Sequence, residues 1–405
     1  MPGDLIDVER ARAIVLERAP RLDSEPVPLR EALGRFLAQP VAAAEDIPGF
    51  DNSAMDGFAV RARDTEGASL GEPRRLRVVD ESRAGHPAAR TLGAGEAIAI
   101  STGAMIPADA DAVVRVEDTE RAGEGVAIAA QIERGTSVRR AGDDVRAGAG
   151  VLEAGVRLGA AELGVLAAVG YPEALCARRP RVAALLTGDE LVAPGEALGP
   201  GQIRDSNAHS VPPLALVAGA EVGSVEIVRD ERAATGEAVE RALGADVAVI
   251  CGGVSVGEHD HVRPALESLG VEEVFWGVAL RPGKPTYFGV APGGTLAFGL
   301  PGNPVSAIVT FLLFVRPALL AMQGADPAAG RITARMACDY EKVPNRTEAI
   351  RVRLEAGEGG WTATPTGPQG SHVLTSMLGA DGLAFAPSGR DVIRAGESLE
   401  VELLR

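Results

Sequence analysis

The residues best suited to chemistry lie in short glycine- and proline-rich segments, each of which joins an apolar run to a predicted helix. The longest is Gly252-Gly253-Val254-Ser255-Val256-Gly257-Glu258-His259-Asp260. Glycines let backbone N–H groups approach an anion closely, and the start of the following helix adds positive potential. We therefore expect Gly252, Gly253 and Ser255 to bind an anion, with Asp260 beside them at the helix start. A simple glycine turn with Asp260 as N-cap is the alternative.

Two further segments carry groups that would recognise an anion. In Leu300-Pro301-Gly302-Asn303-Pro304, Asn303 either caps a helix that begins at Pro304 or forms a second binding rim. Arg281-Pro282-Gly283-Lys284-Pro285 holds two cations three residues apart in a turn that its prolines make rigid. In a protein with a formal net charge of −16, local cations are what a polyanionic ligand requires.

Carboxylates recur in turn-like settings along the chain, at Asp51, Asp56, Asp144, Asp189, Glu190, Asp230 and Asp260. Carboxylates next to anion-binding loops are typical of Mg²⁺ that bridges a phosphate, although any single one is more often a turn or cap residue. Histidine and cysteine do not occur with transition-metal spacing. The sequence also lacks a GxSxG elbow, a Walker motif and a Rossmann GxGxxG.

Residues 181–322 are predicted to form the scaffold that positions these segments. Apolar runs alternate there with helical patterns, at Val182–Leu186, Val222–Val228, Asp246–Cys251, Val271–Phe275 and Thr295–Phe298. Such alternation predicts a doubly wound α/β domain with a parallel sheet, in which ligands lie beyond the carboxyl ends of the strands. Three of the segments described above follow such strands.

The remaining sequence predicts three smaller units around this central domain, which we place at 173–326. Short alternating strands over 47–138 indicate a small inserted β domain. A helical linker domain is expected from 1–46 together with 139–172, including an amphipathic helix from Asp4 to Ala19. Short strands over 327–405 indicate a C-terminal β-barrel.

Length and composition bound the function. At 405 residues, with 46% hydrophobic and 24% charged residues, the chain is an ordinary multidomain globular protein. Its acidity argues against nucleic-acid or membrane-surface binding. The longest apolar stretch, Ala307–Val315, lies between Pro304 and Pro317 and is too short to cross a membrane. Three widely spaced cysteines and an N-terminus without a signal-peptide core indicate a cytoplasmic protein.

Taken together, the motifs resemble those of one family, the molybdopterin molybdenumtransferases, called MoeA in bacteria and related to the E domain of gephyrin. The resemblance runs in order from about residue 5 to 403 and rests on Phe50–Gly57, Ser101–Ala104, Thr187–Leu191, Gly252–Asp260, Arg281–Pro285, Leu300–Pro304 and Thr366–His372. It implies an elongated homodimer whose central domain resembles molybdopterin adenylyltransferase. The implied reaction inserts molybdate into adenylylated molybdopterin with Mg²⁺, releases AMP and yields molybdenum cofactor.

The resemblance also assigns site residues. It implies catalytic roles for Asp260, Glu190, Lys284, Asp56 and Asp144. It implies a metal site at Asp260, Glu190 and Asp230. It implies substrate binding by Thr102, Gly252, Gly253, Ser255, Arg281, Pro301, Asn303, Pro304, Arg351 and Ser371. Two positions depart from the family pattern: Arg281 stands where many members have lysine, and Gly277 where some have a basic residue.

Two other functions fit parts of this pattern. An adenylyltransferase that makes the adenylylated intermediate would share the central fold, but such enzymes resemble residues 175–325 alone. A non-enzymatic scaffold would need no intact loops. The expected partners are adenylyl-molybdopterin, molybdate and a second copy of the chain. The adenylyltransferase and molybdoenzyme apoproteins are further candidate partners.

Overall fold

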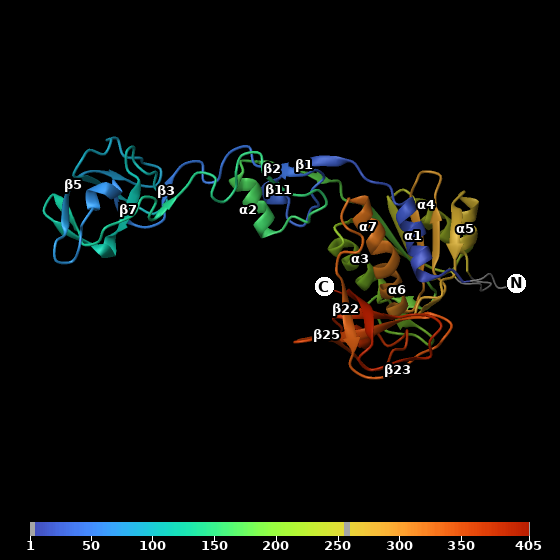
Figure 1. Cartoon of the computed structure of the whole chain (residues 1–405). Helices are drawn as coiled ribbons and strands as arrows, with labels where there is room; N and C mark the ends of the chain where they lie inside the picture. The colour runs from blue at the N-terminus through green and yellow to red at the C-terminus, as the bar shows by residue number, and fades with distance from the viewer. Residues whose placement is uncertain (1–4, 255–259, 405) are drawn as a thin grey trace.

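The computed structural model describes residues 5–254 and 260–404, so Ser255 lies outside the described residues. Figure 1 shows an elongated molecule with a small β-sheet at one end and the central sheet, with the C-terminal strands, at the other. A narrow connecting region that contains α2 (Ala160–Ala168) lies between the two ends. The shape separates the sequence motifs of 50–104 from those of 187–304.

A six-stranded sheet forms the centre of the larger end. In sheet order its strands are β16 (Glu221–Val228), β13 (Arg181–Thr187), β17 (Val247–Cys251), β21 (Leu296–Leu300), β20 (Tyr287–Val290) and β18 (Glu272–Trp276). The first four run parallel, whereas β20 pairs antiparallel with both neighbours. The prediction of a wholly parallel sheet is therefore wrong at this edge. The link from β20 to β21 is too short for the crossover helix that parallel strands require.

Helices cover both faces of this sheet, as predicted for a doubly wound domain. Successive residues of a strand point to opposite faces. Val249 accordingly packs in one apolar core and its neighbour Ile250 in another. The helices are α3 (Asn207–Val217), α4 (Arg232–Ala242), α5 (Val262–Ser268), α6 (Pro304–Thr310) and α7 (Arg316–Met322).

The most apolar helix of the molecule is a core helix. Residues Pro304–Met322 form one continuous helix, long and apolar enough to cross a membrane, but 89% of it is buried inside the protein. Pro317 does not end this helix, because the preceding turn, Phe311–Val315, widens into a π-helix. Proline cannot donate to the carbonyl four residues back and clashes with it in a regular α-helix, and the wider turn relieves both problems.

The N-terminal helix α1 (Val8–Arg18) belongs to the same core. Asp7 caps it, since its Oδ1 accepts the N–H of Glu9 over 2.9 Å and that of Arg10 over 3.3 Å. Val8, Ala11 and Val15 pack with the central domain. Residues 8–18 were predicted as part of the linker domain, but their apolar stripe is buried against the central sheet's helices instead.

The connecting region is built mostly from strand pairs. Its elements are β1 (Ser24–Pro28) with β12 (Glu173–Ala177), β2 (Val41–Ala42) with β11 (Gly150–Leu152), the 3₁₀ turn Leu29–Glu31, and α2. The predicted helical character is therefore limited to α2. A further pair, β3 (Asn52–Ser53) with β10 (Val138–Arg139), leads into the small β-sheet.

The small sheet at the far end has six strands, in agreement with the predicted inserted β domain. In sheet order they are β7 (Ala112–Arg115), β4 (Gly57–Val60), β6 (Glu96–Ile100), β5 (Arg74–Ser82), β9 (Gly125–Ile128) and β8 (Thr119–Ala122). Apolar clusters line both of its faces, with Val114 in one and Val113 in the other. The 3₁₀ turns Ala62–Thr65 and Val116–Asp118 lie at its margins.

The C-terminal strands close into a five-stranded barrel, as the sequence predicted. Around the ring they are β24 (Thr347–Gly357), β25 (Gly360–Pro365), β22 (Arg331–Met336), β28 (Ser398–Leu403) and β26 (Gly382–Ala386). The pairing of β24 with β26 completes the ring. Outside it lie β23 (Tyr340–Glu341), paired with β27 (Val392–Ile393), and the 3₁₀ turn Leu374–Met377.

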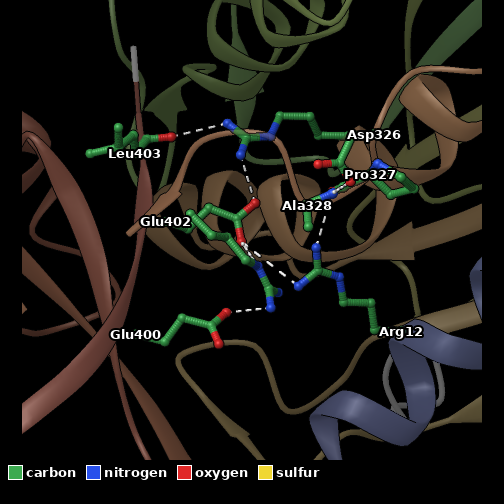
Figure 2. A network of polar contacts seen from close by, with 9 residues as sticks. Arg12, Asp326, Pro327, Ala328, Glu400, Glu402 and Leu403 are labelled. Atoms are coloured by element: carbon green, nitrogen blue, oxygen red, sulfur yellow. Dashed lines mark hydrogen bonds and ion pairs between the residues drawn. The ribbon is translucent and has the colours of Figure 1, made fainter. Parts of the chain in front are cut away.

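A buried ionic network joins this barrel to the central domain (Figure 2). The side chain of Glu402, on β28, is fully buried and accepts from Arg316 Nη2 over 2.7 Å and from Arg331 Nε over 3.2 Å. Arg12 of α1 lies 4.0 Å from the same carboxylate and donates to the carbonyl of Pro327. Arg331 also pairs with Glu400. The first helix and the last strand of the described chain are thus held by one carboxylate.

Candidate functional site

Loops that follow neighbouring strands meet at the carboxyl edge of the central sheet. The N–H of Gly252, after β17, donates to the carbonyl of Leu300, the last residue of β21, over 3.0 Å. A Cβ on Gly302 would lie 3.8 Å from the Cα of Gly252. The structure therefore brings together two segments that were each predicted to bind an anion.

The loop after β17 closes onto the end of β13. Gly252 and Gly253 have φ angles of +92° and +61°, which favour glycine. A Cβ added to Gly252 would lie 2.8 Å from the carbonyl oxygen of Thr187, and a Cβ added to Gly253 would lie 2.9 Å from Thr187 Oγ1. A side chain at either position would therefore push the loop away from Thr187. The buried Thr187 Oγ1 has no hydrogen-bond partner among the described residues.

Carboxylates gather beside these loops. The N–H of Asp230, after β16, donates to Asp189 Oδ1 over 3.3 Å. Burial raises the pKa of Asp230, and the negative charges of Asp189 and Asp260 raise it further. The side chain of Glu190 folds back over Gly188, so that a Cβ added to Gly188 would lie 2.5 Å from Glu190 Oε2. This corner of the site therefore has an excess of negative charge that a cation would relieve.

These carboxylates do not form a closed metal cage. In the part of the chain that the structure describes, no three His, Cys, Asp or Glu side chains are arranged to hold a metal ion. Mg²⁺ commonly binds through one or two carboxylates and completes its coordination with water and substrate phosphates. The chemistry of the oxygen donors here fits that mode rather than an all-protein site.

Two buried polar residues at the same edge were not predicted from the sequence. Asp205 Oδ1 accepts the N–H of Asn207 over 2.8 Å, and Asn207 Nδ2 donates to the carbonyl of Gly302 over 2.8 Å. Their other oxygens, Asp205 Oδ2 and Asn207 Oδ1, are buried without a hydrogen-bond partner in the described structure. Burying such oxygens unpaired is costly, which indicates a ligand or water at this position. The polar run Arg204–Asn207 at the start of α3 was the available signal.

The cation turn extends from the short strand β19 (Leu280–Arg281). The carbonyl of Lys284 accepts the N–H groups of Val278 and Thr286, each over 2.9 Å, so the turn is tied to its own flanks. A Cβ on Gly283 would lie 2.6 Å from Thr310 Cγ2, which places the turn directly against α6. Arg281 and Lys284 are both exposed.

The loop 366–372 reaches the start of α6. The N–H of Val305 donates to the carbonyl of Ser371 over 3.3 Å, which places Ser371 beside Pro304. Asn303 occupies the N-cap position and Pro304 the first helical position, as predicted, but the Asn303 side chain makes no capping bond. Pro301 is buried and Asn303 is exposed.

Arg351 differs from the expected anion-binding cation, because it is fully buried. Its Nη2 lies 3.3 Å from the carbonyls of Pro368 and Gly370, and its Nε donates to Ser376 Oγ over 3.1 Å. Burial lowers the pKa of Arg351. Its guanidinium therefore shapes the loop that carries Ser371 rather than facing solvent.

The other predicted residues lie at the far end of the chain. Asp56 precedes β4, and its Oδ1 accepts the N–H of Thr102 over 2.7 Å, so these two form one feature. Asp144 lies in the connection between the small sheet and the linker, where its N–H donates to the carbonyl of Ile47. Figure 1 shows the sheet of β5 and β7 well separated from α4, α5 and α6. Within one chain, this group does not meet the loops of the central domain.

Comparison with known proteins covers nearly the whole chain. Residues 6–170 match the model described as "MoeA N-terminal region (domain I and II)". Residues 183–321 match "Probable molybdopterin binding domain", and 333–404 match "MoeA C-terminal region (domain IV)".

The chain belongs to the MoeA family.

Full-length relatives agree with this assignment. The "Molybdopterin molybdenumtransferase" of Staphylococcus epidermidis is 34% identical over 401 residues, which is 98% of this chain and 95% of the relative. The "Molybdopterin molybdenumtransferase 2" of Mycobacterium tuberculosis is 39% identical over 384 residues, 93% and 94% of the two chains. The crystal structure of a "molybdopterin biosynthesis moea protein" from Pyrococcus horikoshii superposes with a TM-score of 0.82 at 36% identity, covering 99% of this chain and all of that one.

Proposed function

We propose that the loops at the carboxyl edge of the central sheet are the working site of a molybdopterin molybdenumtransferase. The chain is such an enzyme and inserts molybdenum into adenylylated molybdopterin. The observation that carries the site assignment is the convergence of residues 187–190, 252–253, 281–285 and 301–304 on one edge. Each of these segments follows a strand of the same sheet or packs against α6, so their positions relative to one another are set by the core.

The loops divide the substrates between them. The backbone N–H of Gly253 and the rim of Pro301, Asn303 and Pro304 hold adenylyl-molybdopterin through its phosphates and ring, whereas the N–H of Gly252 donates to Leu300 and sets the position of the loop. Ser371 extends that rim from the C-terminal barrel. Asp205 and Asn207 offer unpaired oxygens to donor groups of the substrate. Lys284 and Arg281 supply the positive charge that molybdate requires.

Mg²⁺ would lie at the carboxylate corner, with Asp260 and Asp230 as its ligands and Asp189 or Glu190 nearby. When bound, the ion neutralises charge on the phosphates that link the pterin to AMP. The N–H of Gly253 and the carboxylates that would hold the ion together position the phosphate chain. Water cleaves the phosphoanhydride bond so that AMP leaves, and the dithiolene sulfurs bond to molybdenum while an oxo group of molybdate departs as water with the two thiol protons.

The site is completed by a second copy of the chain. Asp56, Thr102 and Asp144 have functional roles by resemblance, yet in their own chain they are far from the central loops (Figure 1). In a two-fold homodimer, the small β domain of each chain would reach the central and C-terminal domains of its partner and build two identical sites.

We also retain the division of the chain into four domains, which are 1–46 with 139–172, 47–138, 173–326 and 327–405. The one change is that α1 is reassigned from the first of these to the core of the central domain. Cys176 and Cys251 are buried free thiols, which suits a cytoplasmic enzyme that hands its product to molybdoenzyme apoproteins.

The decisive experiment supplies purified protein with adenylyl-molybdopterin and Mg²⁺, with or without molybdate. The expected result is molybdate-dependent AMP release, together with activation of an added apo-molybdoenzyme. AMP release that does not depend on molybdate would contradict the assignment. Consumption of ATP with metal-free molybdopterin would identify an adenylyltransferase instead.

A further inference from the structure

The cation turn is linked to the C-terminal barrel by an ion pair. Arg281 Nη1 lies 3.4 Å from Glu348 Oε2 on β24. The Glu348 side chain is 3% exposed, whereas that of Arg281 is 44% exposed. One partner is therefore fixed inside the barrel wall and the other reaches the surface beside the proposed molybdate site.

The backbone holds this pair in register. β19 pairs in parallel with β24, so that Arg281 lies opposite Glu348. The N–H of Thr347 donates to the carbonyl of Ala279 over 2.9 Å. Tyr340 Oη donates to Glu348 Oε1 over 2.8 Å, and burial together with this bond raises the pKa of the tyrosine. Tyr340 therefore remains a neutral donor that holds the carboxylate in place.

Lys284, the other cation of the turn, has no ion pair among the residues that the structure describes. Glu348 offsets one unit of the positive charge of this turn, and two cations on the barrel side, Arg351 and Lys342, also interact electrostatically with Glu348. Arginine has five N–H donors, and a single one on Glu348 leaves the others for a ligand. Glu348 thus lowers the positive potential at the turn but leaves most of the N–H donors of its two cations available to a ligand.

We propose that Glu348 is a specificity-determining residue that sets the net charge of the oxyanion site and so limits its affinity for dianions. Molybdate must leave this site for the dithiolene sulfurs, and sulfate is a dianion of the same tetrahedral shape. A buried carboxylate behind Arg281 keeps either anion from binding too tightly. This inference rests on the proposed use of the 281–285 turn as the molybdate site.

The test is Glu348→Gln, which keeps the side-chain shape and an acceptor for Tyr340 but removes the charge. We expect the half-saturating molybdate concentration and the inhibition constant of sulfate to fall about three- to tenfold, with kcat within twofold. Coulomb energy is linear in ligand charge, so perchlorate, a tetrahedral monoanion, should show only the square root of the sulfate shift. A general structural effect of the substitution would change the inhibition constants of sulfate and perchlorate by the same factor.

Matched variants separate charge from packing. Glu355→Gln removes the same charge from an exposed position of the same strand and should leave all three values unchanged. Tyr340→Phe keeps the carboxylate, so the half-saturating molybdate concentration and both inhibition constants should stay within twofold of wild type. The inference is overturned if the inhibition constant of sulfate does not fall in Glu348→Gln, or if the inhibition constant of perchlorate falls by the same factor.

Lys284→Ala distinguishes failure of this inference from failure of the site. If Lys284→Ala raises the molybdate and sulfate values while Glu348→Gln does not lower them, the turn is the oxyanion site and only the role of Glu348 is wrong. If Lys284→Ala changes neither value, the oxyanion site is elsewhere and both proposals for this turn are wrong.

Discussion

Replacing Lys284 with alanine should impair the use of molybdate far more than the binding of adenylyl-molybdopterin. The lysine side chain is exposed and has no ion-pair partner in the described structure, so its charge is available to a ligand. Its contribution to the turn is through its backbone carbonyl, which accepts two N–H groups and survives the substitution. The variant should therefore fold normally and lose one cation from the site.

The size of the effect follows from the contacts that remain. A hydrogen bond from an ammonium group to an anion contributes about 1.5–3 kcal/mol. Arg281 retains its position because Glu348 and the pairing of β19 with β24 hold it independently of Lys284. Only one charged contact is lost, so the half-saturating molybdate concentration should rise about 10- to 100-fold.

The assay is AMP release at varied molybdate, with adenylyl-molybdopterin binding measured separately by equilibrium titration. Lys284→Arg preserves the charge and should recover most of the loss. An unchanged molybdate dependence with weaker pterin binding would place Lys284 at the phosphate site and refute the reasoning.

Three further outcomes are expected. Asp260→Ala should fold normally and slow AMP release about 10²- to 10³-fold, and release within twofold of wild type would exclude a role in the reaction. Asp56→Ala and Asp260→Ala should each be inactive alone, whereas forced mixed dimers should recover up to about half of the wild-type activity per dimer, because one of two sites is then intact. Inactive but folded mixed dimers would place both residues in one chain's site. Burial opposes the ionisation of Asp246, but hydrogen bonds from Arg178 and the Arg181 N–H hold its pKa below 3.8. The resulting stabilisation is present above pH 3.8 and is lost as the pH falls through the lower folded value. Asp246→Asn should therefore cost about 2 kcal/mol at pH 7 and progressively less as the pH falls below 3.8, as followed by thermal unfolding.

Local signals in the sequence were enough to predict the elements that carry the site. The apolar runs of β13, β17 and β21 and the Asn303-Pro304 helix start are each patterns of a few residues. Because parallel strands end at a common edge, the convergence of the loops that follow them was predictable as well.

What the sequence could not reveal depends on contacts between distant segments. The apolar stripe of α1 gives no indication of which core will bury it. Arg351 looks like a surface cation until the loop 366–372 is seen folded around it. Arg281 and Glu348 are 67 residues apart and belong to different domains, so no local sequence pattern could have predicted their pairing. The π-helical turn that accommodates Pro317 has no simple sequence signature.

The network around Glu402 has a consequence for how the protein is made. Arg12 precedes the carboxylate beside it by 390 positions in the chain. Throughout synthesis, α1 can pack its apolar stripe while its arginine lacks that counter-charge, as do Arg316 and Arg331. The ion pairs of Glu402 with these three arginines can form only after β28 has been synthesised (Figure 2). A chain that stops short of this strand would lack the buried carboxylate that pairs with Arg12, Arg316 and Arg331, so that three arginines meant for the interior would be left without their counter-charge.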